Sequence, residues 1–329
     1  MGDTSSIIYR PIGRHEHKQV LDLWSSVFKL GQGYFERYFT VDASPCYQEG
    51  DTLGAWYDEQ LVSTVHIRRI IIRSRDNDGE YLCAAISNVA TLEEYRERGF
   101  SRQLLRMAVD KMEHSGEFDV SLLDTRQPTH YSTFGWEQIS VPATVTIEWE
   151  NFDPAMINVE WRSASEVLSS DRELLLELHT SHPREYQFDR SPSIMFEHWA
   201  GWVWQQDEAI VHICGEVEAG YVVISKPNDI NNIYVSEWRA PNLNVERKLL
   251  KSAAKEIRRR QHQQTNFVRF HGLPQYMSID ELKQCGSALN IGKSEVTMIR
   301  NIRCSRETIG KIKAAYSEGR ATFWPADSF

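Results

Sequence analysis

Ile86-Ser-Asn-Val-Ala-Thr-Leu-Glu-Glu-Tyr-Arg-Glu-Arg-Gly-Phe-Ser-Arg-Gln-Leu-Leu105 is the stretch of sequence that decides the fold of this chain. Apolar residues at its start indicate a strand, a polar turn follows, and from Arg102 onward apolar residues recur at helical spacing. Gly99 and the small Ser101 let the backbone come close to a ligand at the start of the helix. Because the first amides of a helix have no intrahelical partner and carry partial positive charge, this stretch predicts a pyrophosphate site.

The string Arg96-Glu-Arg-Gly-Phe-Ser101 alone would also fit an ordinary loop that enters a helix, so its context has to decide. Residues 118–123 are predicted to form the next strand, and Tyr131-Ser-Thr-Phe-Gly-Trp136 follows it. In this order the two motifs resemble motif A and the downstream tyrosine motif of the GCN5-related N-acetyltransferases (GNATs). Motif A of that family reads Gln/Arg-x-x-Gly-x-Gly/Ala, and here Ser101, which is also small, takes the last position.

The resemblance implies acetyl-CoA as the cosubstrate and assigns a role to each motif. The loop amides would hold the pyrophosphate, and a backbone N–H at the end of the strand would bind the thioester carbonyl. The expected cofactor-binding residues are Val89, Ala90, Thr91, Glu97, Arg98, Gly99, Phe100, Ser101 and Arg102. Tyr131 matches the family's acid tyrosine and would be a catalytic residue that protonates the leaving thiolate, although a packed aromatic residue would fit the same pattern.

The second half of the chain repeats the order of elements in the first half. A predicted hairpin over 209–225, a strand over 232–238, a helix over 244–261 and a strand over 266–270 repeat the order hairpin, strand, helix, strand. The loop after Trp238 lacks the glycine of motif A and contains Pro241, which has no N–H to offer. Two copies of which only the first keeps its phosphate loop are similar to the Eis-like branch of the GNATs.

We therefore expect an α/β (α+β) chain of tandem GNAT folds, each with a mixed, mostly antiparallel central sheet and a splayed strand pair flanked by helices. Residues 1–152 would form the catalytic domain with the acetyl-CoA site, completed by a strand over 143–148. Residues 153–300 would form a second, degenerate domain, and residues 301–329 a C-terminal tail. The length of 329 residues agrees, because it exceeds what one core usually spans.

Composition narrows the choice of partners and compartment. The net charge of -9 disfavours nucleic acid, which would be repelled, and suits a cationic small molecule. No apolar run is long enough to span a membrane, so no membrane partner is expected. The five cysteines are scattered and no pair has metal-ligand spacing, which indicates reduced thiols in a cytoplasmic protein and no bound metal.

Candidates for binding the acceptor amine come from two parts of the chain. Trp24 and Phe28 belong to one predicted helix, and Tyr34 begins a second helical run of aromatic residues after the turn Gly31-Gln-Gly33. Such spacing is typical of core packing but would also suit an aromatic wall around an amine. Asp124, at the end of a predicted strand, would bind a cation. Three side chains are candidates for the general base, and each could equally be a structural polar residue: Asp124, His130 and His66.

The end of the chain, Ala321-Thr-Phe-Trp-Pro-Ala-Asp-Ser-Phe329, is more aromatic than a solvated terminus usually is. It therefore predicts docking against an apolar surface. In Eis-type enzymes the terminal carboxylate reaches the active site and helps to deprotonate the amine. The resemblance thus implies a catalytic role for Phe329, with simple docking of the tail as the alternative.

Together these patterns predict an acetyl-CoA-dependent N-acetyltransferase. It would transfer an acetyl group, by direct attack in a ternary complex, to a primary amine of a small cationic molecule such as an amino acid, a polyamine or an aminoglycoside-like compound. Two alternatives stay open: a protein-lysine acetyltransferase, and a non-catalytic acyl-CoA-binding sensor or interaction protein. The sequence also leaves open whether the chain forms a homo-oligomer.

Overall fold

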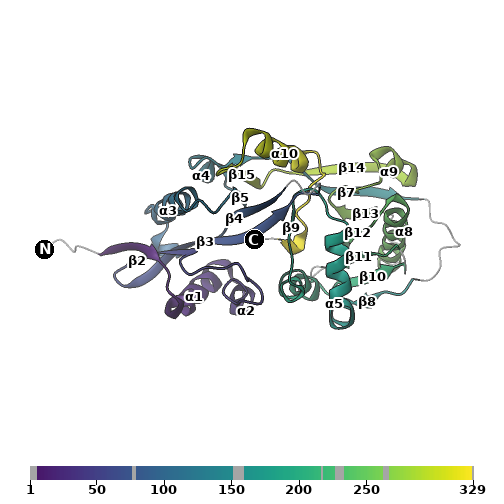
Figure 1. Cartoon of the computed structure of the whole chain (residues 1–329). Helices are drawn as coiled ribbons and strands as arrows, with labels where there is room; N and C mark the ends of the chain where they lie inside the picture. Colours follow the sequence, from purple (N-terminus) through teal and green to yellow (C-terminus); the bar gives the residue numbers. More distant parts are fainter. Residues whose placement is uncertain are drawn as a thin grey trace.

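The computed structural model describes residues 6–75, 79–150, 159–215, 218–226, 233–261 and 267–327. Over these residues the chain forms two mixed β-sheets that lie next to each other in an elongated molecule, with helices packed on both (Figure 1). Most neighbouring strands in each sheet run antiparallel. This architecture confirms the expected α/β fold with two mostly antiparallel sheets.

The first sheet has the strand order β1-β2-β3-β4-β5-β15-β6, and β9 pairs with the end of β3. Its strands are β1 Ile7–Pro11, β2 Thr52–Tyr57, β3 Gln60–Arg73, β4 Glu80–Thr91, β5 Val120–Asp124, β6 Glu137–Gln138, β9 Gln187–Phe188 and β15 Thr297–Asn301. Only β4 and β5 run parallel among the described pairs of this sheet. This pair lies in the middle of the sheet, and helix α3 connects its two strands.

The second sheet has the order β14-β7-β13-β12-β11-β10-β8. Its strands are β7 Val141–Trp149, β8 Arg162–Ser163, β10 Ile210–Cys214, β11 Gly220–Ser225, β12 Tyr234–Arg239, β13 Phe267–His271 and β14 Gly286–Ser294. β12 and β13 run parallel, as β4 and β5 do in the first sheet. The second sheet therefore repeats the plan of the first, as the order of elements in the sequence predicts.

The two halves of the chain exchange strands. β7 belongs by sequence to the first half, yet it lies in the second sheet between β13 and β14. β15, from the second half, occupies the corresponding place in the first sheet, between β5 and β6. The expectation that a strand over 143–148 completes the first domain is therefore wrong: the strand forms, but both of its partners belong to the second sheet. Alternation of side chains along a strand does not specify which sheet the strand joins, so the pattern of residues 143–148 could not predict the partners of β7.

α-Helices pack against both sheets. Their bounds are α1 His17–Phe28, α2 Gln32–Glu36, α3 Phe100–His114, α4 Pro128–Ser132, α5 Ala164–Ser181, α6 Ser193–Phe196, α7 Trp202–Gln206, α8 Leu243–Arg260, α9 Ile279–Cys285 and α10 Arg306–Ser317. In α3 the apolar residues recur on one buried face that includes Leu104, Leu105, Ala108 and Met112. They pack in one cluster with strand residues such as Ile67. Burial of each leucine or methionine side chain in this set contributes roughly 1.5–3 kcal/mol.

The last helix, α10, packs on the first sheet although it is encoded at the end of the chain. Ile312 and Tyr316 are fully buried and share a cluster with Ile72 of β3 and Val120 of β5. The Tyr316 hydroxyl donates a hydrogen bond to the backbone carbonyl of Tyr186 at 3.0 Å. Residues 306–317 therefore contribute to the core of the first sheet.

A buried ion network holds the last described residue, Asp327, in the interior. Arg190 donates to Asp327 from Nε at 2.8 Å and to Glu237 of β12 from Nη1 at 2.8 Å. Tyr221 donates to the same glutamate at 2.7 Å. Arg190, Glu237 and Asp327 are 2%, 0% and 5% exposed. Removing one partner of a buried pair costs about 3–5 kcal/mol because the other charge is left unpaired, so this network fixes the position of Asp327.

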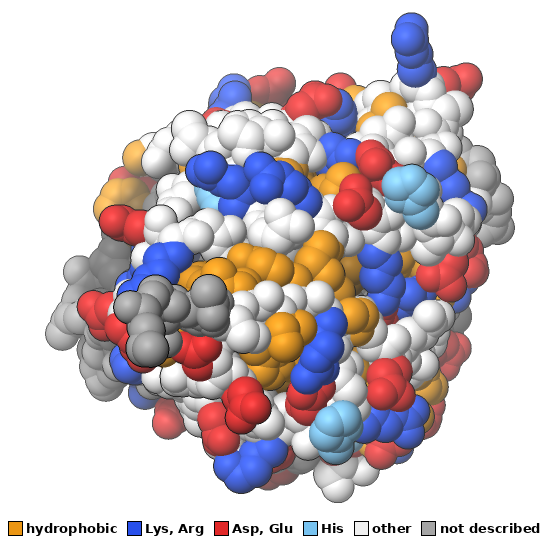
Figure 2. Space-filling view, turned by 90° about the vertical axis from the view of Figure 1, so that its left-hand side faces the viewer, with side chains coloured by type: hydrophobic (Ala, Val, Ile, Leu, Met, Phe, Trp, Pro, Cys, Tyr) orange, Lys and Arg blue, Asp and Glu red, His pale blue; other side chains and the backbone are white. Residues whose placement is uncertain are grey.

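The surface carries both signs of charge. Viewed from the β2 end, hydrophobic side chains gather across the middle of the face, with Lys, Arg, Asp and Glu interspersed around them (Figure 2). The net charge of -9 is therefore not concentrated on this face. None of the helices in the described ranges has both the length and the apolar character needed to cross a membrane.

His66 on β3 is a buried histidine that the fold holds in its neutral form. It is 1% exposed, and its ring lies 5.2–5.9 Å from the rings of Trp24, Tyr38 and Phe39. Burial lowers the pKa of His66 to about 3, whereas a histidine in an unfolded chain titrates near ~6.5. As the pH falls below ~6.5, the unfolded state therefore binds a proton that the folded state refuses, and the folded state loses stability down to the folded pKa.

We accordingly expect the melting temperature to fall between pH 7 and pH 5, and the His66→Gln variant to show a shallower fall. The free energy of unfolding should fall less steeply with pH in His66→Gln, by up to about 1.4 kcal/mol per pH unit. Thermal unfolding followed by circular dichroism at several pH values measures it. Equal slopes in both proteins would assign the pH dependence to another buried histidine, such as His179, whose pKa burial also lowers to about 3.

Candidate active site

The candidate active site lies where β4 and β5 separate. The parallel pairing of the two strands ends at Ala85 and Leu122. β4 nevertheless continues to Thr91, whereas β5 ends at Asp124. The part of β4 that follows Ala85 therefore has no β5 partner and borders an opening in the middle of the first sheet. This is the splayed strand pair that the sequence predicts.

A β-bulge lies on β4 beside this opening. Ser87 pairs with His66 and Ala90 pairs with Thr64, so two residues of β4 face one residue of β3. Asn88, the first of the two, has a positive φ of 47°. Because a bulge disrupts the ladder locally and re-aims side chains, it brings the residues around Asn88 to the opening.

A pocket of about 260 Å³ occupies the opening. Its lining comes from the region of α1 and α2, from β4, from the end of β5 and from α4: Phe28, Leu30, Tyr34, Phe35, Tyr38, Ile86, Ser87, Asn88, Val89, Asp124 and Tyr131. The structure thus brings together residues that the sequence predicts for three roles. Val89 is predicted to bind the cofactor, Phe28 and Tyr34 are predicted to bind the acceptor, and Asp124 and Tyr131 are the polar candidates. Sequence reasoning had placed them in separate motifs.

Tyr131, on α4, is held at the pocket by ring contacts. Its ring lies 5.1 Å from that of His130 and 6.3 Å from that of Trp136. Burial raises the pKa of Tyr131 to about 12, so the phenol keeps its proton throughout the physiological range. Within the part of the chain that the structure describes, no group accepts a hydrogen bond from its hydroxyl. The hydroxyl is therefore available to a ligand in the pocket.

Asp124 is the carboxylate of the pocket. It ends β5, and its side chain stays accessible from the pocket. Desolvation nevertheless raises the pKa of its carboxyl above the ordinary value. The other two candidate bases, His66 and His130, do not line the pocket, and His66 keeps a pKa too low to accept a proton near neutral pH.

The loop before α3 has the backbone that motif A predicts. Gly99 caps the helix in the left-handed region, at φ 84°, and Glu97 also has a positive φ of 64°. No side chain caps this helix end, and its first hydrogen bond runs from the amide of Gln103 to the carbonyl of Gly99. The amides of Phe100 to Arg102 therefore precede the ladder of the helix and are available to an anion.

The side chains of the expected cofactor residues differ in what they can offer. Phe100 and Ala90 are buried in the core, so only their backbone can reach a ligand. The Thr91 hydroxyl lies 2.8 Å from that of Ser63. Arg98 donates one hydrogen bond to the carbonyl of Glu94, so only part of its guanidinium is available to a ligand. Arg102 is exposed at the start of the helix.

Two buried polar atoms at the pocket test whether the acyl end of acetyl-CoA fits it. The Ser87 hydroxyl is buried without a hydrogen-bond partner in the described residues, and the buried side-chain nitrogen of Asn88 lies near the Tyr38 hydroxyl. Unpaired buried polar groups cost free energy and usually mark a missing ligand or water. A thioester and its adjoining amides offer suitable partners, so the residues present fit the acyl end of acetyl-CoA.

The predicted acceptor residues divide between pocket and core. Phe28 and Tyr34 line the pocket. Trp24 does not: it is fully buried, and its Nε1 donates to the Thr64 hydroxyl at 2.8 Å. Trp24 therefore packs behind the residues that line the pocket. Helical spacing alone could not distinguish a residue that lines the pocket from one that packs in the core.

Leu30, Ser87 and Asn88 also line the pocket, and sequence reasoning did not single them out. One signal was present. Asparagine is enriched at positive φ, so an asparagine inside an apolar strand could have indicated the bulge at Asn88. Nothing in the sequence marks Leu30, because it lies in a connection between two helices.

The corresponding helix of the second half, α8, has a different start. The side chain of Asn242 caps it by accepting from the amide of Val245 at 3.0 Å. The carboxylate of Glu246, which is fully buried, accepts from Trp238 and from the backbone amides of residues 275–277. A capped helix start with a buried carboxylate in its first turn is unsuited to a pyrophosphate.

We therefore expect one equivalent of acetyl-CoA per chain at saturation. Calorimetric titration of the full chain measures the stoichiometry. Two equivalents would show that the second half also binds the cosubstrate, and would contradict our interpretation of α8.

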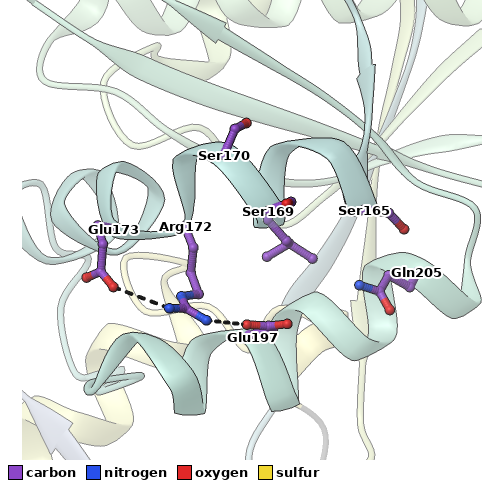
Figure 3. A pocket seen from close by; sticks show the side chains of 8 residues that line it. Ser165, Ser169, Ser170, Arg172, Glu173, Glu197 and Gln205 are labelled. Carbon is purple, nitrogen blue, oxygen red and sulfur yellow. Dashed lines mark hydrogen bonds and ion pairs between the residues drawn. The ribbon is translucent and has the colours of Figure 1, made fainter.

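A larger pocket, of about 380 Å³, lies in the second half beside a kink in α5 (Figure 3). Its charged side chains pair with one another: Arg172 contacts Glu197 and lies 3.6 Å from Glu173. Around them the lining is mainly serine. Size alone would favour this pocket, but it lacks the splayed strands and an uncapped helix start, so we place the candidate active site at β4 and β5.

Comparison with known proteins gives the class of the first half. Residues 8–139 match the family model described as an acetyltransferase (GNAT) domain. No curated protein matches the chain significantly. This part of the chain, with both sequence motifs, is thus a GNAT acetyltransferase domain, and the α3 loop and pocket lie within it.

Solved structures extend the similarity to the whole fold. A conserved protein of Enterococcus faecalis V583, described as a probable N-acyltransferase, shares 16% identity at a TM-score of 0.69, covering 91% of this chain and 73% of its own. A GCN5-related N-acetyltransferase from Kribbella flavida shares 17% identity at 0.64, covering 91% and 72%. Eis1 from Mycobacterium abscessus shares 15% identity at 0.62, covering 90% and 74%. The chain thus shares the fold of these solved structures.

Phe329, the second predicted catalytic residue, lies outside the described residues. The last described residue is Asp327, held by Arg190. Arg68 is close enough to Asp327 for their charges to interact, and it also interacts with the pocket residue Tyr38. Arg68 itself is buried, with its guanidinium 3.3 Å from the centre of the Trp199 ring.

Proposed function

We propose that the chain is an acetyl-CoA-dependent N-acetyltransferase that acts on the primary amine of a small molecule. The main support is one arrangement: Asp124 and Tyr131 meet Val89 at the opening between β4 and β5, in the same domain as the uncapped start of α3. A pyrophosphate at α3, a thioester at Val89, a proton donor at Tyr131 and a cation at Asp124 would then share one site.

Acetyl-CoA, when bound, supplies a thioester carbon that the amine nitrogen attacks, so that a C–N bond forms, the C–S bond breaks and CoA leaves as its thiol. The backbone N–H of Val89 would donate to the carbonyl oxygen, where negative charge develops. The Tyr131 phenol would give its proton to the sulfur, and the second proton that the nitrogen loses as the amide forms would restore the phenol. Because its pKa is raised to about 12, Tyr131 always holds the proton that this requires.

The amine must lose a proton before it attacks, because an alkyl ammonium has a pKa near ~10.4. Asp124 would bind the ammonium and accept its proton, directly or through water. The raised pKa of Asp124 narrows the gap between the two groups and makes this transfer less uphill. His66 and His130 have lowered pKa values, so they are weaker bases than a free histidine.

Release of free CoA from acetyl-CoA, measured with and without amines, tests the proposal. We expect CoA release that depends on a primary amine, with an acetylated product detected by mass spectrometry. Tight binding of acetyl-CoA without turnover of any amine would instead favour the sensor. Preference for lysine in a histone peptide over every free amine would favour a protein-lysine acetyltransferase.

The terminal carboxylate of Phe329 remains a further proposed catalytic group. Its support is the buried network that holds Asp327 two residues before it. Deleting Ser328 and Phe329, or adding a few residues after them, is expected to lower turnover far more than acetyl-CoA affinity. Phe329→Ala is the matched control, because it keeps the carboxylate in place and removes only the ring. Full activity in the extended protein would rule the carboxylate out.

A further inference from the structure

We propose that the acceptor is a compact amine with a single positive charge and an aromatic or branched aliphatic body. This inference rests on the proposed function and narrows its substrate class. It follows from the pocket's charge, from the walls that surround Asp124, and from the pocket's size.

The described lining of the pocket provides for one cation. Among the described residues that line it, Asp124 is the one carboxylate, and none is Lys or Arg. A second ammonium group in the pocket would be desolvated without a partner, which weakens its binding. The carboxylate of an amino acid would likewise meet no cation in the lining and would lie near Asp124. Polyamines, aminoglycosides and amino acids are therefore poor matches.

The wall of the pocket is aromatic and rigid. The ring of Phe35 lies 4.9 Å from that of Tyr34 and 5.8 Å from that of Phe28. Tyr34 is held from behind by the guanidinium of Arg37 at 4.6 Å and by the ring of Trp202 at 5.1 Å. Because these rings are fixed before any ligand arrives, an apolar acceptor would lose little free energy in ordering them.

The rim of the pocket leaves apolar surface uncovered. Phe28 and Leu30 are 39% and 46% exposed, which is high for large hydrophobic residues that line a pocket. Covering this apolar surface with an apolar acceptor is favourable because it removes the surface from water. A second charged group of an acceptor that extended out of the pocket would contact this apolar rim and be partly desolvated there.

The size of the pocket limits the part of the acceptor that the pocket can enclose. Pockets for small molecules usually measure ~300–1,000 Å³, and this one, at about 260 Å³, lies below that range. The acyl end of acetyl-CoA must share the same opening. The pocket therefore suits an amine with one ring or one branched chain.

Steady-state kinetics with acetyl-CoA can compare 2-phenylethylamine and isopentylamine with putrescine, spermidine, lysine, kanamycin and a lysine peptide. We expect kcat/KM for the two monoamines to exceed each of the others by about tenfold or more, the worth of one unpaired charge at a half-buried site. A higher kcat/KM for any of the polycationic, amino-acid or peptide acceptors would overturn the proposal.

A binding measurement separates this proposal from the proposed function. Calorimetric titration of the protein–CoA complex with 2-phenylethylamine and with putrescine requires no turnover. Tighter binding of 2-phenylethylamine without any acetylation would support the acceptor class and refute the enzyme. Equal or tighter binding of putrescine would refute the acceptor class, whether or not acetylation occurs.

A charge added at the rim provides the sharpest variant. Leu30→Glu places a second carboxylate at an exposed position that the fold tolerates, and Leu30→Gln is the neutral control of the same size. We expect Glu, and not Gln, to shift the kcat/KM ratio by about three- to tenfold towards putrescine. An unchanged ratio in Leu30→Glu would show that the charge count of this pocket does not set the acceptor class.

Discussion

Gly99→Asp is expected to abolish measurable acetyl-CoA binding while leaving the chain folded. Gly99 caps α3 at φ 84°, and a Cβ placed there would meet no atom within 4 Å. The folded chain therefore has room for the new side chain, at a cost of about 1–3 kcal/mol for the left-handed backbone. The carboxylate, however, would stand where the amides of Phe100 and Ser101 are expected to bind the pyrophosphate, and two anions at one helix start repel each other.

Two controls separate charge from strain. Gly99→Asn has nearly the same shape without the charge, so it should weaken binding much less. Gly116→Asp makes the same substitution at the far end of α3, also at positive φ and also in open space. It should lower the melting temperature by a similar amount and leave acetyl-CoA affinity unchanged. Calorimetry that finds wild-type affinity in Gly99→Asp would refute the phosphate-loop assignment.

Tyr131→Phe is expected to lower kcat by roughly a hundredfold or more, the usual worth of a positioned proton donor. The ring contacts with His130 and Trp136 do not involve the hydroxyl, so the variant should fold and bind acetyl-CoA normally. The loss should appear in kcat at saturating acceptor, because the phenol acts on the leaving sulfur and not on either substrate's binding.

Tyr81→Phe controls for the loss of a tyrosine hydroxyl elsewhere on the same strand-rich domain. Tyr81 lies on β4 at the end remote from the pocket, half-buried in another cluster. Its kcat should stay near the wild-type value. If kcat of Tyr131→Phe also stays unchanged, Tyr131 packs in the pocket wall and another group protonates the sulfur.

Local patterns predicted those parts of the fold that local forces determine. The glycine at 99, the helical period after Arg102 and the strand before them are fixed by neighbouring residues, and the structure has each of them. The partners of β7 could not be predicted in the same way. The alternation of its side chains would fit a strand in either sheet. Only the packing of the whole chain decides which sheet β7 joins.

The candidate site shows the same division. Tyr131 and Asp124 could be proposed because motifs and strand ends mark them. Trp24 and Phe28 have the same helical spacing, yet one is buried behind the pocket and the other is at its rim. Which face of α1 meets the sheet is a matter of tertiary packing, and a period of 3.6 residues does not carry that information.

The exchanged strands also bear on how the protein is made. β15 is translated near the end of the chain, but it covers the outer edge of β5, the strand that carries Asp124. During synthesis on the ribosome, the edge of β5 therefore stays unpaired until residue 301 has emerged. An unpaired strand edge can form hydrogen bonds with a strand of another chain. A chain cut after the GNAT domain would keep every residue of the pocket and still lack the strand beside it. Such fragments are expected to aggregate, and the proposed acetyl transfer should begin only after residue 301 has been synthesised.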